Sequence, residues 1–165
     1  MMIKDALLPE FDHEMGTTRR LLERVPDDRL SWQPHQKSMT LGRLATHVAE
    51  IPHWAQTIIK DSVFDLNPDE FVPKTASSRA ELLRTFDDSV AAARALVAAA
   101  SDGELMATWT MKSGGHEVLS LPKAAVWRSF VMNHMIHHRG QLSVYLRENN
   151  VPIPAIYGPS ADEAN

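Results

Sequence analysis

Apolar residues recur at spacings of three and four along most of the chain, which is the period of an amphipathic α-helix. The spacing predicts four helices: one from about residue 4 or 9 to 24, one that follows Ser38 or Thr40 and ends near 61, one over 78–100 and one over 122–149. Pro9 is expected near the first turn of the first helix, and Pro52 is expected to kink the second helix after Val48. Each helix has an apolar stripe to bury, so the sequence predicts an all-α fold, a four-helix bundle.

The segments between the predicted helices differ from one another. Residues 108–119 alternate around Ser113-Gly114-Gly115, which predicts a short hairpin or irregular insertion before the last helix. Residues 62–77 contain Pro68 and Pro73 and predict a long loop across one end of the bundle. Residues 151–165 begin with a proline-punctuated apolar stretch, and we expect a packed, extended tail. Since neither a repeat nor a linker divides the chain, we expect a single domain over residues 1–165.

Composition narrows the possible functions. The 165 residues are 44% hydrophobic and carry a net charge of −4, which argues against a nucleic-acid-binding protein. The chain has no cysteine, so any metal site must use nitrogen or oxygen ligands. Neither a leader segment nor a membrane-length apolar run is evident, and we expect a cytoplasmic protein without a membrane partner.

Histidines are concentrated in the last predicted helix. His134 and His138 are one turn apart and replace core residues on its inward stripe. Two histidines at this spacing are adjacent metal ligands, and His47 in the second helix is the best-placed third ligand. Three histidines leave a coordination position open, so a water bound there could serve as the nucleophile or be displaced by substrate. The alternative is a packed or partly exposed histidine pair that binds no metal.

Two further residues could support such a site. Glu50 is one turn from His47 and could orient a ligand or a bound water, although a solvated charge is the competing interpretation. His137 lies about 100° around the helix from His138, and we assign it to packing or to a contact behind the ligands. No side chain is assigned as the catalyst.

Three motifs together resemble a known family. They are Leu41-Gly42-Arg43-Leu44-Ala45-Thr46-His47-Val48-Ala49-Glu50, Asn133-His134-Met135-Ile136-His137-His138-Arg139-Gly140-Gln141-Leu142, and Ile156-Tyr157-Gly158-Pro159-Ser160-Ala161-Asp162-Glu163. The sequence is similar to the DinB-like four-helix proteins, a superfamily that includes bacterial thiol S-transferases. The resemblance implies a divalent metal, commonly zinc or nickel, held by His47, His134 and His138. It also implies a frequent homodimer.

The resemblance and the histidines lead to two functional expectations. The first is a metal-dependent thiol S-transferase or hydrolase that acts on a small-molecule thiol or electrophile. A metal can lower the pKa of a bound thiol, so no protein cysteine is needed. The second is a non-catalytic, stress-responsive homodimer in which the histidines bind metal or stabilise the fold.

Overall fold

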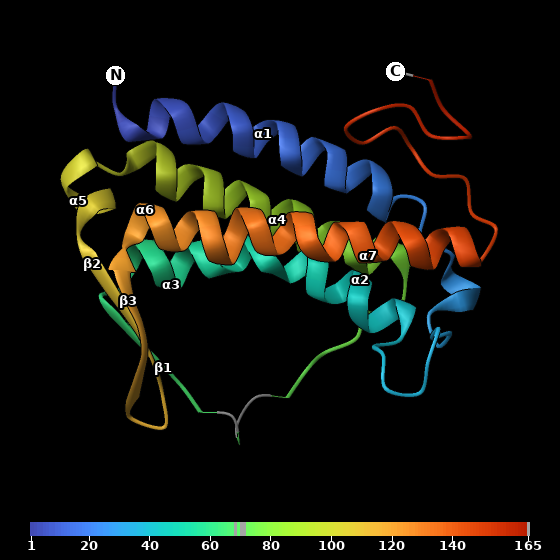
Figure 1. The fold of residues 1–165 in the computed structure, drawn as a ribbon, viewed down its shortest axis with the longest axis horizontal. Helices are drawn as coiled ribbons and strands as arrows, with labels where there is room; N and C mark the ends of the chain where they lie inside the picture. The colour runs from blue at the N-terminus through green and yellow to red at the C-terminus, as the bar shows by residue number, and fades with distance from the viewer. Residues whose placement is uncertain (68, 70–71, 165) are drawn as a thin grey trace.

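The structure, a computed structural model, describes residues 1–67, 69 and 72–164. Its long helices run side by side along the molecule, and a small sheet lies at one end (Figure 1). Helical elements are α1 (Ile3–Leu22), η1 (Asp27–Arg29), α2 (Leu41–Glu50), η2 (Ile51–His53), α3 (Trp54–Lys60), α4 (Arg79–Ala99), α5 (Asp102–Met106), α6 (Lys123–Val126), η3 (Trp127–Asn133) and α7 (His134–Glu148). The strands are β1 (Val63–Leu66), β2 (Thr108–Ser113) and β3 (His116–Pro122). The fold is mostly helical, and the sheet shows that the all-α prediction was too narrow.

Helix α4 forms the centre of the packing, since it contacts α1, α2 and α3, while α7 contacts α1 and α2. The predicted start of α4 is confirmed, because the Ser78 side chain accepts a hydrogen bond from the Glu81 backbone N–H. Helix α1 begins earlier than Pro9, which therefore lies inside the helix and not in its first turn as predicted. In the described chain no helix combines the length and apolarity that a bilayer span requires.

The second predicted helix is interrupted at Pro52, as expected. Helix α2 ends at Glu50, a single 3-10 turn, η2, contains the proline, and α3 resumes at Trp54. Proline supplies no N–H donor and crowds the preceding turn, so the regular helical hydrogen bonding stops there. The bend separates the part of this rod that carries His47 from the part that carries Trp54.

The small sheet includes one strand that the sequence did not predict. The hairpin of β2 and β3 is confirmed, and its turn places Gly114 and Gly115 at φ of 56° and 83°, where glycine is favoured. Strand β1 pairs in parallel with β2, although its residues were expected to be loop. The Asp65 carboxylate accepts a hydrogen bond from the Gly115 N–H at 3.1 Å, which links β1 to the turn. Residues 68, 70 and 71 of the predicted loop lie outside the described residues.

The sequence predicted one helix over residues 122–149, but the last helical rod is not a single regular α-helix. Residues Trp127–Asn133 form a π-helical segment, η3, between α6 and α7. A π-helical turn contains more residues than an α-helical turn, so it changes the rotation of everything that follows. The segment ends at the residue before His134, and π-helical turns often occur beside functional sites.

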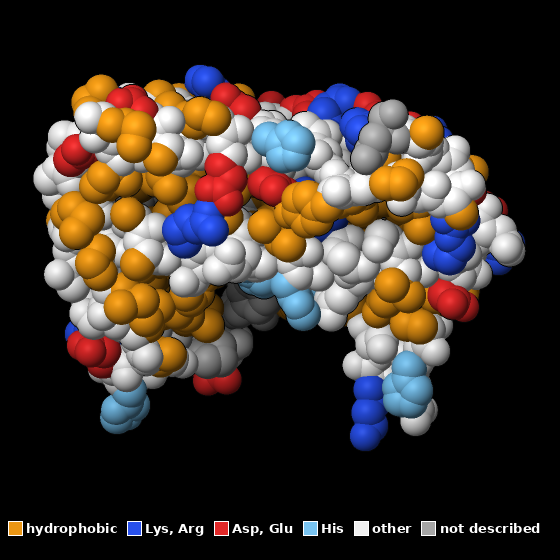
Figure 2. Space-filling view, turned by 45° about the horizontal axis from the view of Figure 1, so that its top comes forward, with side chains coloured by type: hydrophobic (Ala, Val, Ile, Leu, Met, Phe, Trp, Pro, Cys, Tyr) orange, Lys and Arg blue, Asp and Glu red, His pale blue; other side chains and the backbone are white. Residues whose placement is uncertain are grey.

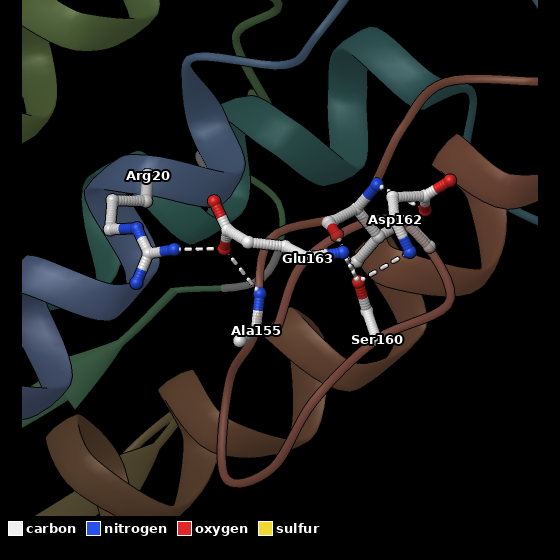
Figure 3. Close-up of polar contacts among 6 residues, drawn as sticks. Arg20, Ala155, Ser160, Asp162 and Glu163 are labelled. Atoms are coloured by element: carbon white, nitrogen blue, oxygen red, sulfur yellow. Dashed lines mark hydrogen bonds and ion pairs between the residues drawn. The ribbon is translucent and has the colours of Figure 1, made fainter. Parts of the chain in front are cut away.

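Residues 151–164 return along the surface between α1 and α7 (Figures 1 and 3). The Glu163 carboxylate accepts a hydrogen bond from the Ala155 N–H at 2.7 Å and pairs with Arg20 of α1. The Ser160 hydroxyl accepts the N–H groups of Asp162 and Glu163 at 3.1 and 3.0 Å. These contacts fold the tail on itself and attach it to α1.

Candidate metal centre

The structure brings His47, His134 and His138 into one cluster, as the sequence predicted. One ligand-type ring nitrogen from each residue lies within 4.8 Å of those of the other two. The Nε2 atoms of His47 and His134 are 3.1 Å apart. Helices α2 and α7 pack together, and the one-turn spacing of the two α7 histidines places both rings beside His47.

The three imidazoles favour the neutral state. Burial, the neighbouring His138 and His134, and the Arg43 guanidinium lower the pKa of His47 to about 4. Burial is also the main cause that lowers the pKa of His134 and His138 below the ordinary histidine value. A neutral imidazole has one ring nitrogen with a free lone pair, so the cluster can offer three nitrogen donors at neutral pH.

The geometry fits a divalent metal. With Zn–N bonds of about 2.0–2.1 Å, two nitrogens of a tetrahedral site are about 3.3 Å apart. The 3.1 Å separation of the His47 and His134 Nε2 atoms is close to this value. Three imidazole donors suit zinc, nickel, copper or iron. A closed tetrahedral site would need one further ligand.

An ion pair flanks His47 on α2. Arg43 is one turn before His47 and Glu50 is one turn after it, so the three side chains share one face of the helix. The Arg43 Nη1 and Glu50 Oε2 atoms lie 3.6 Å apart. Among the described residues Nη1 has no hydrogen-bond partner although it is buried. The sequence analysis identified Glu50 but missed Arg43, because a helix arginine is usually a solvated charge.

A second residue that the sequence analysis missed lies behind His138. The Gln141 Oε1 and His138 Nδ1 atoms are 2.7 Å apart, so a proton on Nδ1 would leave Nε2 free to bind a metal. His137 is exposed and only packs edge-on against the His138 ring, at 4.8 Å between centroids. The spacing i, i+3 between His138 and Gln141 was the available sequence signal.

A cleft of about 600 Å³ opens beside two of the three histidines. His47 and His134 contribute to its wall, and so does Glu50. The volume falls within the range of small-molecule sites, about 300–1,000 Å³. Figure 2 shows that one face of the molecule is hollowed between two projections, with a histidine side chain at the upper edge of the hollow. The cleft gives a ligand access to His47 and His134.

The far wall of the cleft comes from α4. Its buried residues are Leu82, Phe86, Ser89, Ala93 and Val97. Thr85 and Ser89 both line the cleft. A serine on the inward face of a helix is easily mistaken for a surface residue, so the hydrophobic pattern could not identify this hydroxyl.

Comparison with known proteins agrees with this architecture. The chain is 29% identical over 165 residues to the uncharacterized protein YrdA of Bacillus subtilis (strain 168), covering 96% of this chain and 90% of the relative. It is 27% identical over 154 residues to the uncharacterized protein YjoA of the same strain, covering 90% and 92%. A DinB-like protein of Bacillus cereus ATCC 10987 has a similar solved structure, with a TM-score of 0.71, 20% identity and coverage of 93% and 97%.

The solved structure of the DinB-like protein YjoA from Bacillus subtilis gives a TM-score of 0.67 at 21% identity, with coverage of 88% of this chain and 92% of that chain. At these identities the structural likeness concerns the fold. The model of the DinB family matches residues 1–165, which include all three clustered histidines and the C-terminal tail. The chain therefore belongs to the DinB family.

Proposed function

We propose that the protein is a metal-dependent enzyme for small molecules, with His47, His134 and His138 as ligands of zinc or nickel. The observation that carries the proposal is the cluster of three neutral imidazoles, with ring nitrogens within 4.8 Å, at the wall of an open cleft. In this proposal the members of a four-helix bundle are α1, α2–α3, α4 and η3–α7. The metal lies between α2 and α7. Thiol S-transfer is the favoured reaction and hydrolysis is the alternative.

The metal, when bound, would supply a Lewis-acidic position at which a thiol or a water loses its proton more easily. The chain's own residues would hold the metal and orient the groups bound beside it. His47 and His134 bring their Nε2 atoms together at the cleft wall, and Gln141 fixes the ring of His138. Arg43 places a positive charge beside the ligands, which favours an anionic nucleophile over a neutral one. Glu50 lies at the wall, where it can accept a proton from a bound group.

Metal content is the direct test. Tag-free protein, purified and reconstituted with zinc or nickel, is expected to hold about one equivalent by plasma mass spectrometry. His47→Ala, His134→Ala and His138→Ala should lose the metal while circular dichroism remains helical. His53→Ala is the matched control, because His53 lines the same cleft but lies outside the cluster. Wild-type protein that holds no metal after reconstitution would overturn the proposal.

A second measurement separates the two reactions. The metal-loaded protein is mixed with a chromogenic electrophile, with and without a low-molecular-weight thiol. A transferase forms the thioether only when the thiol is present, whereas a hydrolase consumes an ester probe without it. If the metal is bound but neither reaction exceeds that of the His138→Ala variant, the histidines hold a metal without turnover.

A further inference from the structure

The cleft beside the histidines has a markedly apolar wall. Ile51, Trp54 and Phe64 contribute to it from η2, α3 and β1. The rings of Trp54 and Phe64 meet edge to face, with centroids 5.3 Å apart, and Trp54 also packs on Phe130 at 5.7 Å. These contacts fix the indole while leaving it half-buried, so part of its surface faces the cleft. A fixed aromatic surface of this kind favours a flat, apolar ligand.

One buried polar group interrupts the opposite wall. Ser89 is only 8% exposed and lines the cleft from α4. Its hydroxyl makes no hydrogen bond to another described residue, and it is not one of the described atoms that are both fully buried and unpartnered. Helix serines commonly donate to the carbonyl four residues earlier, as Ser129 does to Ala125. The Ser89 hydroxyl makes no such bond within the described chain, so its donor is available to a group in the cleft.

Away from the histidines, the charges of the cleft do not favour either sign. The described acidic residue at the wall is Glu50, which lies 3.6 Å from the guanidinium of Arg43. The described lysine at the wall is Lys74, which is exposed. Besides His47, His53 and His134, the other described polar residues at the wall are Thr57, Thr85 and Ser89, which carry no charge. Away from the histidines, a ligand with a neutral polar atom matches this lining better than a carboxylate or an ammonium group.

We propose that the cleft binds an uncharged aromatic carbonyl compound, with its ring against Trp54 and its carbonyl oxygen accepting a hydrogen bond from the Ser89 hydroxyl. This inference rests on the proposed function in one respect, because it takes the cleft as the substrate side of the histidine cluster. Ser89 is then a specificity residue: it selects ligands by one acceptor atom and holds no metal.

A matched pair of probes isolates this hydrogen bond. 2-Acetylnaphthalene and 2-ethylnaphthalene have the same ring system, and only the first has a carbonyl oxygen. Affinities are measured by NMR titration, following the backbone amide signals of the cleft residues in protein that has been through reconstitution with zinc. The acetyl compound should bind about 2- to 10-fold more tightly, as one net hydrogen bond predicts. Ser89→Ala should abolish this ratio, and the helix tolerates the change because alanine is the best helix former.

Two control variants complete the experiment. Ser143→Ala removes a hydroxyl on α7 that bonds the Gly140 carbonyl away from the cleft, and it should leave the ratio unchanged. Trp54→Ala should weaken both probes alike. Equal affinities of the two probes for wild type, or an unchanged ratio in Ser89→Ala, would overturn this inference while metal content still supports the proposed function. Absent metal with an intact ratio would overturn the proposed function and leave the carbonyl site standing.

Discussion

The hydroxyl of Tyr157 donates a 2.9 Å hydrogen bond to the carboxylate of Glu14, which is 143 residues away in the sequence. The same hydroxyl accepts a hydrogen bond from Arg139 Nη2 at 2.7 Å, and Arg139 Nη1 lies 2.6 Å from Glu14 Oε2. The Arg139 and Glu14 side chains are 1% and 7% exposed. This network joins the tail, α1 and α7, and it is buried at Arg139 and Glu14, whereas Tyr157 is 65% exposed. Arg139 directly follows the candidate ligand His138.

The network predicts a large effect on stability. Arg139→Met should lower the free energy of unfolding by about 3–5 kcal/mol, because it leaves the buried Glu14 charge uncompensated. Tyr157→Phe should cost about 0.5–1.5 kcal/mol, since it removes the hydroxyl that bonds both charged groups while Tyr157 itself is exposed. Urea unfolding followed by circular dichroism measures both. Arg147→Met is the control, because its pair with Asp162 lies at the surface and should contribute little to stability. Equal losses in Arg139→Met and Arg147→Met would contradict the buried network.

Gln141 is expected to control metal affinity without contacting the metal. Gln141→Met keeps the side-chain length but removes the acceptor beside His138 Nδ1, so the ring and its tautomer are no longer fixed. We expect zinc affinity, measured by competition with a chelating dye, to fall about 10- to 100-fold.

His137→Gln provides the comparison for Gln141, because His137 is a neighbour of His138 that only packs against it. Its zinc affinity should stay near that of wild type. A loss in His137→Gln that matched the loss in Gln141→Met would show that ring packing, and not the hydrogen bond, orients His138.

Two helical glycines should respond in opposite ways to alanine. A Cβ at Gly42 would lie 3.0 Å from the Leu30 carbonyl oxygen and 3.1 Å from Thr75 Cγ2, so Gly42→Ala should destabilise by about 1–3 kcal/mol. A Cβ at Gly140 in α7 would meet nothing within 4 Å, and Gly140→Ala should stabilise by about 0.5–1 kcal/mol. Thermal unfolding of both variants checks the signs. Stabilisation in both would mean that α2 is not held close to Leu30.

The metal-free protein should become less stable in mild acid. Burial lowers the pKa of His47 to about 4, whereas in the unfolded chain it stays near the ordinary value of 6.5. Between these values the unfolded chain binds a proton that the folded protein does not, so stability falls as pH drops from about 6.5 toward 4. The lowered pKa values of His134 and His138 act in the same direction.

Urea midpoints of metal-free protein between pH 7.5 and 4 measure this effect. The His47→Gln variant lacks the group with the largest shift, and its curve should be flatter over that interval. A wild-type curve no steeper than that of the variant would rule out the buried neutral imidazole as the cause.

Much of the site could be predicted because helical spacing is local. His134 and His138 are one turn apart, so a helix at this position places their rings together whatever surrounds it. The kink at Pro52 is equally local, since it follows from the missing donor of one residue. His47 was predicted as the third ligand because it lies beside an apolar stripe of the second predicted helix.

Other features depend on contacts between distant segments and could not be predicted. Strand β1 exists because β2 supplies hydrogen-bond partners from 47 positions further along, as in the pair Val63 and Thr110. Ser89 resembles a surface residue until the packing of α4 turns it inward. The partnership of Glu14 with Arg139 likewise needs the complete fold before two solvated charges become a buried pair.

The π-helical segment η3 gives the last rod a built-in register offset. Upstream of it, Val126 is buried in the core, and downstream of it, His134 and His138 lie beside His47. Because a π-helical turn accommodates an extra residue, removing one residue from 127–133 would restore regular α-helical pairing and leave the rotation of α7 relative to α6 nearly unchanged. Both imidazoles would then stay in the cluster. Converting the full-length segment to regular α-helix would instead rotate α7 and carry both imidazoles away from His47, without altering any residue of the candidate metal centre.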